Sequence, residues 1–169
     1  MARTGFIGLG SNVGSRQGNL QRAIDRLSAT EGIEVTLQSQ IYESAPVDVV
    51  IEQGDYLNQV VGIESGLSPV DLRQVCVDIE YELGREIEHR SGLPRTIDLD
   101  IISLGNLAGG FENVKLPHPR YSRRRFVLQP LADIAPHYRD PVTGHNVSYM
   151  LENCDAEDLR VFPIAEVEV

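Results

Sequence analysis

An α+β fold with an antiparallel sheet is the fold class that three features of the sequence predict. Several stretches alternate apolar and polar residues with the two-residue period of a strand, and two others repeat apolar residues with the period of an amphipathic helix. The order of these stretches is strand, helix, strand, strand, helix, strand, with further short elements behind them. The length of 169 residues predicts a single domain, residues 1–169.

The first half of the chain is predicted to contain three strands and a helix. Residues 4–10 indicate a buried strand, and residues 20–27 carry the apolar stripe of a helix. Residues 33–42 alternate as a strand with one wet face, and residues 56–63 form the third strand. The connection between them, residues 43–55, is long for a compact domain, which favours a ligand-binding loop.

The second half opens with a helix, because Ser68 suits the N-cap, Pro69 suits the first helical position and Gly84 suits the end. The other predicted elements are a strand within residues 95–102, a glycine-containing turn and short strand at 106–115, an arginine-rich helical segment up to residue 134, a short helix near 147–151 and a closing strand at 159–162. The first six elements have the order of the ferredoxin-like βαββαβ fold, with the helices on one face of the sheet. The rest are C-terminal helical and strand additions.

The composition argues against several classes of protein. The formal net charge of −10 disfavours broad binding to nucleic acid or to anionic membranes. No apolar run approaches the ~18 residues of a membrane span, and the first residues lead into a strand rather than a signal peptide. Cys76 and Cys154 lack any metal-type or C-x-x-C spacing, so both are expected to be reduced. A cytoplasmic protein is therefore expected.

Arginine is concentrated in two places. The chain has fourteen arginines and a single lysine, Lys115. Seven of these arginines lie in two short segments: Arg85, Arg90 and Arg95, then Arg120, Arg123, Arg124 and Arg125. Because a guanidinium group binds phosphate in a planar, bidentate manner, this clustering in an acidic protein indicates a compact polyanionic ligand.

Two acidic residues share one face of the predicted strand at 95–102. Asp98 and Asp100 are two residues apart, so they project on the same side with roughly 7 Å between their Cα atoms, while the aliphatic residues between them face the other side. Two such carboxylates repel each other unless a cation sits between them, and Mg²⁺ prefers carboxylate oxygens, waters and phosphates. Arg95 adds a phosphate-binding charge at the start of the strand. A solvated acidic face is the alternative interpretation of this short motif.

The glycines of the first strand do not complete a known phosphate-binding motif. Gly8, Gly10 and Gly14 have the spacing G-x-G-x-x-x-G, one residue longer than the dinucleotide fingerprint, and the P-loop pattern is absent. The turn at Ser11-Asn12 is interpreted as one that lets the backbone come close to a ligand.

Several segments together resemble one family, the 6-hydroxymethyl-7,8-dihydropterin pyrophosphokinases of folate biosynthesis. The matching segments, in the family's order, are Gly10-Ser11-Asn12, Tyr56-Leu57-Asn58, Gly84-Arg85, the run from Pro94 to Ile101, Pro117-His118-Pro119-Arg120 and the run from Arg124 to Pro136. The resemblance covers residues 4–138, and the P-R-T-I-D-L-D-I run is its most specific part.

The resemblance implies that the terminal diphosphate of ATP is transferred to the hydroxymethyl group of a reduced pterin, with release of AMP. It implies that Asp98 and Asp100 hold two Mg²⁺ ions and that Arg85 and Arg95 act with them in catalysis by neutralising the transferring group. The ATP-binding residues implied are Glu80, Arg85, Arg95, Ile101, His118 and Arg124. Such a transfer needs positioning and charge neutralisation more than covalent help, which this set of groups would supply.

The pterin site is implied in the same way. Its residues would be Ser44, Ala45, Val47, Tyr56, Asn58, Asp98 and Phe126. Tyr56 and Phe126 would lie on the two faces of the pterin ring, and Asn58 with the backbone near Ser44 would hydrogen-bond its edge. An aromatic pair and an amide that both donates and accepts suit a flat heteroaromatic ligand.

Each of these residues also has a simpler interpretation. Tyr56 and Phe126 would serve equally as core aromatics, and His118 between two prolines as a surface or capping residue. Arg123 and Arg125 would then make surface ion pairs of little energetic value. The remaining histidines are interpreted as surface residues: His89, His137 and His145.

The chain departs from the family in the loop 86–93. That loop is usually basic and carries Trp-Gly, whereas here Glu86 and Glu88 are acidic and the chain has no tryptophan. A slower enzyme or weaker ATP binding is therefore predicted, since such loops often govern turnover, and Glu88→Lys would change the steady-state kinetics if the loop charge matters. Ser44-Ala45 stand where the family more often has Thr-Pro, a change expected to be mild.

Two other functions stay open at this point. One is a catalytically weakened paralogue that binds pterin or nucleotide without forming AMP, and the other is a two-metal nucleotidyl- or phosphotransferase of another pathway that ignores pterin. Small-molecule substrates, no nucleic-acid or membrane partner and a monomer are expected. The sequence does not define the turnover rate, the loop motions, the oligomeric state or any association with other folate enzymes.

Overall fold

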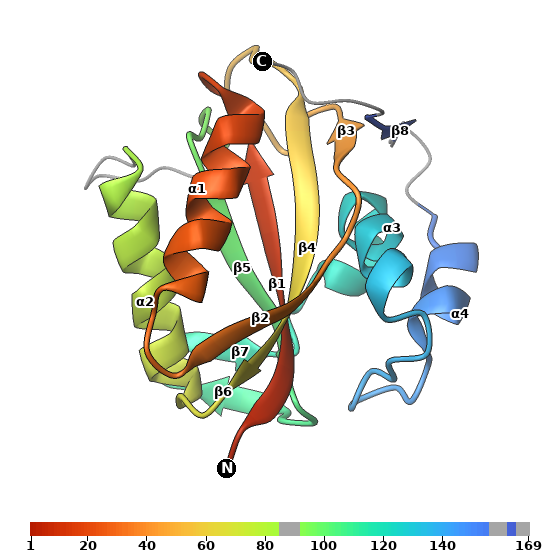
Figure 1. Cartoon of the computed structure of the whole chain (residues 1–169). Helices are drawn as coiled ribbons and strands as arrows, with labels where there is room; N and C mark the ends of the chain where they lie inside the picture. The colour runs from red at the N-terminus through yellow and green to blue at the C-terminus, as the bar shows by residue number, and fades with distance from the viewer. Residues whose placement is uncertain (85–91, 156–161, 165–169) are drawn as a thin grey trace.

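Figure 1 shows a computed structural model of the chain, which describes residues 1–84, 92–155 and 162–164. In chain order its elements are β1 (Arg3–Ser11), α1 (Arg16–Ser28), β2 (Ile33–Gln38), β3 (Tyr42–Ser44), β4 (Tyr56–Ser65), α2 (Pro69–Glu82), β5 (Asp98–Leu104), β6 (Gly109–Phe111), β7 (Val114–Leu116), a 3₁₀ turn (Tyr121–Arg123), α3 (Arg125–Ile134), α4 (Val147–Glu152) and β8 (Phe162–Pro163). Among the helices of these residues, none is long and apolar enough to cross a membrane.

The main sheet has the strand order β5-β1-β4-β3-β8, and β2 pairs with β4 on the same side as β3. The strand pairs described in this sheet are antiparallel, which confirms the predicted mixed fold with an antiparallel sheet. β1 and β4 are its central strands, and β5 lies at one edge. β6 and β7 form a separate two-stranded hairpin.

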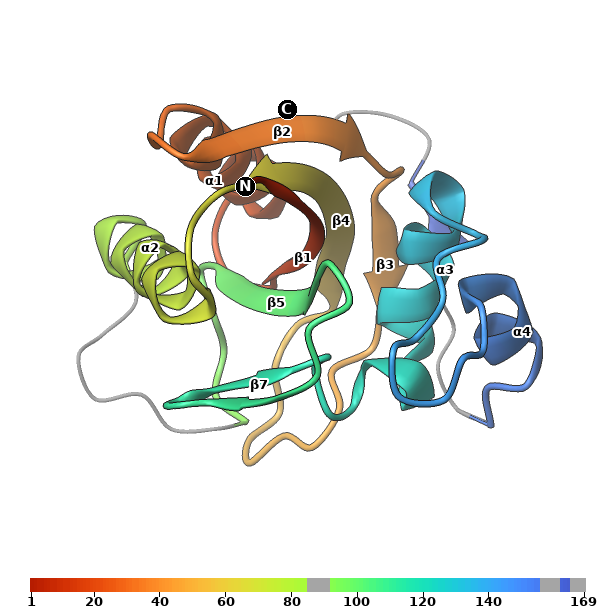
Figure 2. The same ribbon diagram turned by 90° about the horizontal axis from the view of Figure 1, so that it is seen from below.

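Helices cover both faces of the sheet. In Figures 1 and 2, α1 and α2 lie on one face, as expected for the first two helices, while α3 lies on the opposite face with α4 packed against it. The sheet is therefore the middle layer of three. Each face has its own hydrophobic core.

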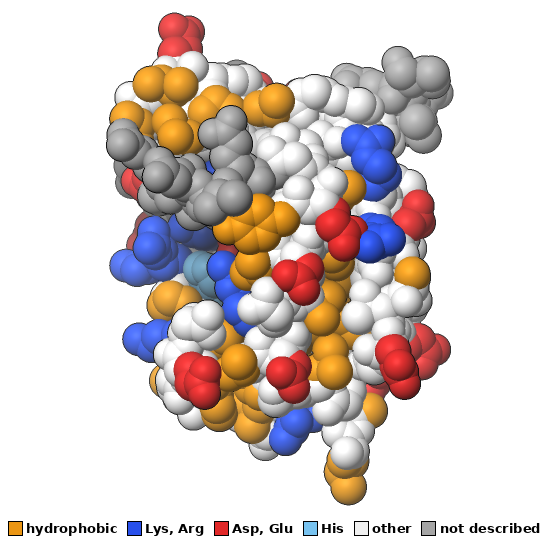
Figure 3. All heavy atoms as spheres, turned by 90° about the vertical axis from the view of Figure 1, so that its left-hand side faces the viewer, with side chains coloured by type: hydrophobic (Ala, Val, Ile, Leu, Met, Phe, Trp, Pro, Cys, Tyr) orange, Lys and Arg blue, Asp and Glu red, His pale blue; other side chains and the backbone are white. Residues whose placement is uncertain are grey.

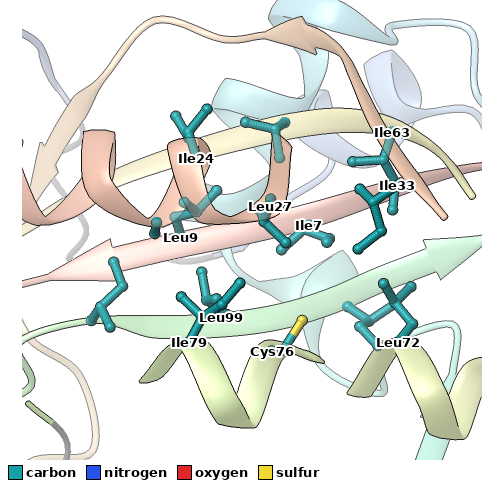
Figure 4. Packing of buried hydrophobic residues seen from close by; sticks show 14 of the residues in the cluster. Ile7, Leu9, Ile24, Leu27, Ile33, Ile63, Leu72, Cys76, Ile79 and Leu99 are labelled. Carbon is teal, nitrogen blue, oxygen red and sulfur yellow. The ribbon is translucent and has the colours of Figure 1, made fainter. Parts of the chain in front are cut away.

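The larger core lies between the sheet and the α1–α2 layer (Figure 4). Ile7 and Leu9 of β1 point into it, because alternate residues of a strand face the same side. α1 contributes Ile24 and Leu27 from the helix layer, and Leu99 of β5 lies beside Leu9 on the sheet. Because this core covers one face of β1 and β5, only their other face is available for the second core and for a ligand site.

The smaller core lies between the sheet and α3. Phe6 of β1, Val60 of β4 and Ile102 of β5 pack there against Leu128 and Leu131 of α3. Along the same face of β1 the side chains change from phenylalanine at position 6 to glycine at positions 8 and 10. The second core therefore ends partway along β1, and a cavity takes its place.

The predicted strand 33–42 is wrong in its length. β2 ends at Gln38 and β3 begins at Tyr42, and both pair with β4. Ser39 lies in the gap, where its hydroxyl accepts a hydrogen bond from the backbone N–H of Val60 (2.9 Å) and donates one to the carbonyl of Gln40 (2.7 Å). The alternation of apolar and polar residues continues across the break between β2 and β3, where the Ser39 side chain hydrogen-bonds to the backbone. Periodicity alone therefore does not reveal that there are two strands.

Other predicted elements agree with the structure apart from their ends. β5 runs from Asp98 to Leu104, so it begins and ends later than the predicted strand at 95–102, and the segment at 106–115 is a two-stranded hairpin rather than a turn with one strand. The arginine-rich segment is a 3₁₀ turn followed by α3. The predicted closing strand falls mostly on residues 156–161, outside the described residues, although β8 pairs with β3 at Phe162 and Pro163. Cys76 and Cys154 are free thiols, as predicted.

Candidate active site

A cavity of about 160 Å³ opens where the second core ends. It is bordered by the carboxyl-terminal part of β1, the start of β4, β5, the loop after β3 and the segment that leads into α3. The sequence-predicted residues that line it are Ser44, Ala45, Val47, Tyr56, Asn58, Arg95, Asp98, Asp100, His118, Arg124 and Phe126. The structure therefore brings together residues from five separate parts of the chain.

Asp98 and Asp100 lie side by side in register with the two glycines of β1. Asp98 is opposite Gly10 and Asp100 is opposite Gly8 in the antiparallel pair. Both carboxylates are half-buried and line the cavity, whereas Leu99 between them is buried in the larger core. Because glycine has no side chain, the space above the neighbouring strand stays open beside the carboxylates.

The donor set around the carboxylate pair distinguishes between metals. Among the residues that the structure describes, no group of three or more histidine, cysteine, aspartate or glutamate side chains could hold an ion. A structural zinc site would need such a group, but Mg²⁺ commonly takes only one or two carboxylates and completes its shell with water and substrate phosphate. Asp98 and Asp100 therefore fit magnesium better than zinc.

Positively charged groups form another wall of the cavity. Arg95, Arg120 and Arg124 line it together with His118. In Figure 3 lysine and arginine side chains gather beside a histidine at one edge of the face shown. An anionic ligand would thus meet guanidinium groups close to the acidic pair.

His118 is held between β5 and the arginines. Its backbone N–H donates to the carbonyl of Ile102 (2.8 Å), and its ring Nδ1 accepts from the backbone N–H of Arg120 (3.1 Å). Burial, followed by the positive charges of Arg124 and Arg120, lowers the pKa of His118 from 6.5 to about 4. The ring is therefore neutral near pH 7, and with Nδ1 accepting, its Nε2–H is the donor.

The other end of the cavity is aromatic and amide-lined. Asn58 and Ser44 are both buried, and the Nδ2 group of Asn58 donates to the hydroxyl of Ser44 (2.7 Å). With Nδ2 engaged, Oδ1 is the Asn58 atom suited to accept a hydrogen bond from a ligand. Tyr56 and Phe126 are half-buried and border this end, and the guanidinium carbon of Arg124 lies 5.5 Å from the centroid of the Phe126 ring.

Among the described residues, two predicted site residues, Ile101 and Glu80, do not line the cavity. Ile101 is buried in the larger core. Glu80 of α2 is 1% exposed and lies 3.8 Å from Arg73 between Oε1 and Nη1. Arg85 falls outside the described residues, as do Glu86 and Glu88.

Arg123, Arg125 and His145 lie outside the cavity. Arg125 donates to the backbone carbonyl of Cys154 (3.1 Å) instead of making the expected ion pair, and the rings of His145 and Tyr149 are tilted against each other with 4.4 Å between their centroids. Arg123 is exposed and does not border the cavity. Tyr56, Phe126 and His118 do border it, and His118 also caps the backbone N–H of Arg120, so their contacts with substrates stay predictions.

Sequence reasoning missed several cavity residues. Gly8 and Gly10 form its floor, and Asp48, Arg120 and Val127 border it. A signal for the glycines existed, because they share one face of β1, but their pairing with Asp98 and Asp100 follows only from the strand order. Arg120 was seen as part of an arginine cluster without being assigned to the site.

A sheet-mounted carboxylate pair, facing guanidinium groups and adjoining an aromatic-walled end, defines an enzyme class that handles a polyphosphate together with a flat ring. A sequence model of the 7,8-dihydro-6-hydroxymethylpterin-pyrophosphokinase family matches residues 6–136. The chain belongs to this family.

Two relatives carry the name 2-amino-4-hydroxy-6-hydroxymethyldihydropteridine pyrophosphokinase. The Synechocystis protein is 39% identical over 159 residues, covering 94% of this chain and 79% of the relative. The Bacillus subtilis protein is 40% identical over 162 residues, covering 96% of this chain and 92% of the relative. Among solved structures, Plasmodium falciparum HPPK-DHPS with pteroate gives a TM-score of 0.73 at 12% identity over 90% of this chain. The match spans 42% of that longer chain and supports the fold alone.

Proposed function

We propose that this protein transfers the terminal diphosphate of ATP to the hydroxymethyl group of 6-hydroxymethyl-7,8-dihydropterin, giving the pterin diphosphate and AMP in folate biosynthesis. One observation carries the proposal: a single cavity is lined by the carboxylates of Asp98 and Asp100, by several arginines, and by Tyr56, Asn58 and Phe126. The polyphosphate and the ring that must react therefore have adjoining places. The named relatives support the same reaction.

On the nucleotide side, Asp98 and Asp100 would hold two Mg²⁺ ions, which when bound neutralise phosphate charge and orient the transferring group. Arg95 and Arg124 would bind the phosphate oxygens, and Arg85 is proposed to join them. His118 would donate its Nε2–H to a phosphate oxygen without adding charge. These fixed donors act where charge is redistributed during transfer, which is where such groups lower the barrier most.

Ile101 could contribute through its backbone. β5 is a sheet edge, and the carbonyl of Leu99 points outward to accept from Arg73 (3.4 Å between Nη1 and O). Backbone groups alternate sides along an antiparallel strand, so those of Ile101 face the same way as those of Leu99. They are proposed to hydrogen-bond the nucleotide base. The predicted contact between Glu80 and ATP stays a prediction.

On the pterin side, Tyr56 and Phe126 would lie against the faces of the ring. Asn58 would accept from the ring edge through Oδ1, while the backbone of Ser44, Ala45 and Val47 would complete the edge contacts. Asp98 lies between the two sides and is proposed to contact both substrates. In-line transfer then depends on how the two ends of the cavity are held relative to each other.

We also propose a ferredoxin-like topology for the core of the fold. The order β5-β1-β4-β2, with α1 and α2 on one face, is the arrangement expected of a ferredoxin-like βαββαβ core, to which β3, α3, α4 and β8 are added. The expected single domain, monomeric state, cytoplasmic location and absence of nucleic-acid and membrane partners stay predictions.

A direct assay tests the function. The protein is incubated with ATP, MgCl₂ and 6-hydroxymethyl-7,8-dihydropterin, and AMP is measured by chromatography. AMP should form only when the pterin is present, and Asp98→Asn or Asp100→Asn should reduce turnover by at least about 10³-fold, because each removes a metal-holding charge. Asp78→Asn, an exposed carboxylate on α2, is the matched control. Binding of both substrates without AMP would favour the paralogue that only binds.

A further inference from the structure

One buried amide hydrogen-bonds to two segments that are far apart in the sequence, the backbone at Arg95 and the end of the loop 45–54. Asn12, in the turn after β1, is 8% exposed. Its backbone N–H donates to the carbonyl of Arg95 (3.0 Å), and its side-chain Oδ1 accepts from the backbone N–H of Arg95 (2.7 Å). The backbone of Arg95 is thus held at two points by one residue.

The nitrogen of the same amide holds a different segment. Nδ2 of Asn12 donates to Oε1 of Gln53 (2.8 Å) and to the carbonyl of Gly54 (3.1 Å). Nε2 of Gln53 in turn donates to the carbonyl of Gly92 (2.7 Å), which also accepts from the backbone N–H of Val50 (3.1 Å). A continuous hydrogen-bonded chain therefore runs from Arg95 through Asn12 and Gln53 to Gly92.

Close packing independently supports this contact between loops. Gly92 has a φ of +83°, a conformation that favours glycine. A Cβ atom at position 92 would lie 2.7 Å from the carbonyl oxygen of Asp48 and 2.9 Å from Cγ2 of Val50. The backbone at Gly92 therefore touches the loop 45–54, which lines the aromatic end of the cavity through Ala45 and Val47.

We propose that Asn12 is a positioning residue that sets the place of Arg95 relative to the pterin-side loop. The inference rests on the proposed function, in which Arg95 serves ATP and the loop serves pterin. An amide is required, because its oxygen must accept from a backbone N–H while its nitrogen donates twice to oxygens. Asn12 acts through these partners rather than by touching the reacting groups.

Two variants separate the two halves of the connection. Gln53→Leu removes the link to Gly92 but leaves Arg95 held by Asn12, so the KM for pterin should rise about fivefold while the KM for ATP stays within about twofold. Asn12→Ala releases both segments, so kcat should fall about tenfold or more and both KM values should rise. A general loss of stability would not divide the kinetic parameters in this way.

The control is Ile24→Val, a conservative change in the larger core that removes one buried methylene and none of the hydrogen bonds described above. Its kinetics are compared with those of the variants at temperatures equally far below each Tm. Turnover and KM values of Asn12→Ala within about twofold of wild type, or a loss equal to that of Ile24→Val, would overturn the inference.

A measurement without catalysis separates this inference from the proposed function. Amide hydrogen exchange in residues 50–54 and 92–95 should become faster in Asn12→Ala than in wild type and should be unchanged in Ile24→Val. If wild type forms no AMP, the proposed function fails, and unchanged exchange in Asn12→Ala overturns the connection itself. Faster exchange with intact turnover shows that the connection exists but does not position the catalytic groups.

Discussion

At the scale of single residues, the surroundings of His118 determine its protonation state and its tautomer. Burial of the ring, together with the two neighbouring arginines, favours its neutral form. The backbone N–H of Arg120 donates to Nδ1, so the proton of the neutral ring is on Nε2. A neutral donor binds phosphate without requiring a further positive charge next to Arg124. The sequence showed a histidine between two prolines, but neither its tautomer nor its neighbours.

We predict that the pKa of His118 in the free protein is near 4 and rises when ATP binds, because phosphate charge stabilises the protonated ring. An NMR pH titration checks this, with His118→Gln used to assign the signal. A ring that titrates near 6.5 in the free protein would contradict the prediction.

The same shift predicts a pH dependence of stability. The pKa of His118 is lower in the folded than in the unfolded chain, so the unfolded chain binds more protons between pH 6.5 and 4. This contribution is present above pH 6.5 and is lost as the pH falls toward 4, by about 2 kcal/mol after allowance for partial exposure. Urea unfolding should show a smaller loss over this range in His118→Gln than in wild type.

At the scale of elements, β1 leaves room for the cavity because two of its residues have no side chain. The strand fills the larger core with Ile7 and Leu9 and leaves the opposite face bare at Gly8 and Gly10. A Cβ at position 10 would lie 3.3 Å from Cδ1 of Tyr56, whereas one at position 8 would meet only ordinary contacts of 3.6 Å or more. The two glycines therefore differ in what a methyl group would disturb.

We predict that Gly10→Ala raises the KM for pterin by about fivefold, since Tyr56 must shift, at a cost of ~1 kcal/mol. Gly8→Ala should instead raise the free energy of unfolding by about 0.5 kcal/mol, because alanine restricts the unfolded chain and fits the strand. Steady-state kinetics and urea unfolding of both variants test this. Equal changes of the KM for pterin and of the free energy of unfolding in the two variants would contradict the prediction that a methyl group disturbs Tyr56 only at position 10.

β3 is short, and its position depends on α3. The hydroxyl of Tyr42 lies 2.9 and 2.8 Å from the two carboxylate oxygens of Asp133, and burial together with this carboxylate raises the pKa of Tyr42 to about 12. Two residues further on, β3 places Ser44 against Asn58. A contact between two elements thus supports the pterin end.

Tyr42→Phe should lower the free energy of unfolding by about 1–2 kcal/mol, because it removes a hydrogen bond to a charged group. It should also raise the KM for pterin more than that for ATP, since β3 carries Ser44. Urea unfolding and steady-state kinetics measure both effects. Unchanged stability would mean that solvent replaces the tyrosine hydroxyl without loss.

The sequence predicted elements better than it predicted the site. Local signals, such as the N-cap at Ser68 and the apolar stripes of α1 and α2, were enough for the helices. Asp98 and Asp100 were also found, because strand alternation is local. The sequence indicates a turn at Ser11-Asn12 but not the side-chain contacts of Asn12, because its partners Arg95 and Gln53 are 83 and 41 residues away and only the folded backbone aligns the donors with the acceptors.

On the scale of the whole molecule, charge is unevenly distributed. The chain has a formal net charge of −10, yet three arginines and a histidine border one cavity. The local positive charge is therefore surrounded by an acidic protein, and attraction of an anion depends on short-range contacts more than on the overall field.

This arrangement predicts a selective effect of salt. Raising NaCl from about 0.05 to about 0.5 M should increase the KM for ATP roughly threefold, because screening weakens guanidinium–phosphate attraction in this open cavity. The KM for the uncharged pterin should stay within about twofold over the same range. Parallel changes in both KM values would point to a general effect of salt on the protein.

The second core has a consequence for how short a working fragment can be. The family match ends at residue 136, but Val147 and Met150 of α4 are buried with Leu128 of α3 beneath the sheet. A fragment cut at that point would expose apolar surface to water on the sheet face behind β5, the strand that carries Asp98 and Asp100. If this fragment were insoluble or unfolded, the cause would be the loss of packing between α3 and α4, not the loss of a catalytic residue.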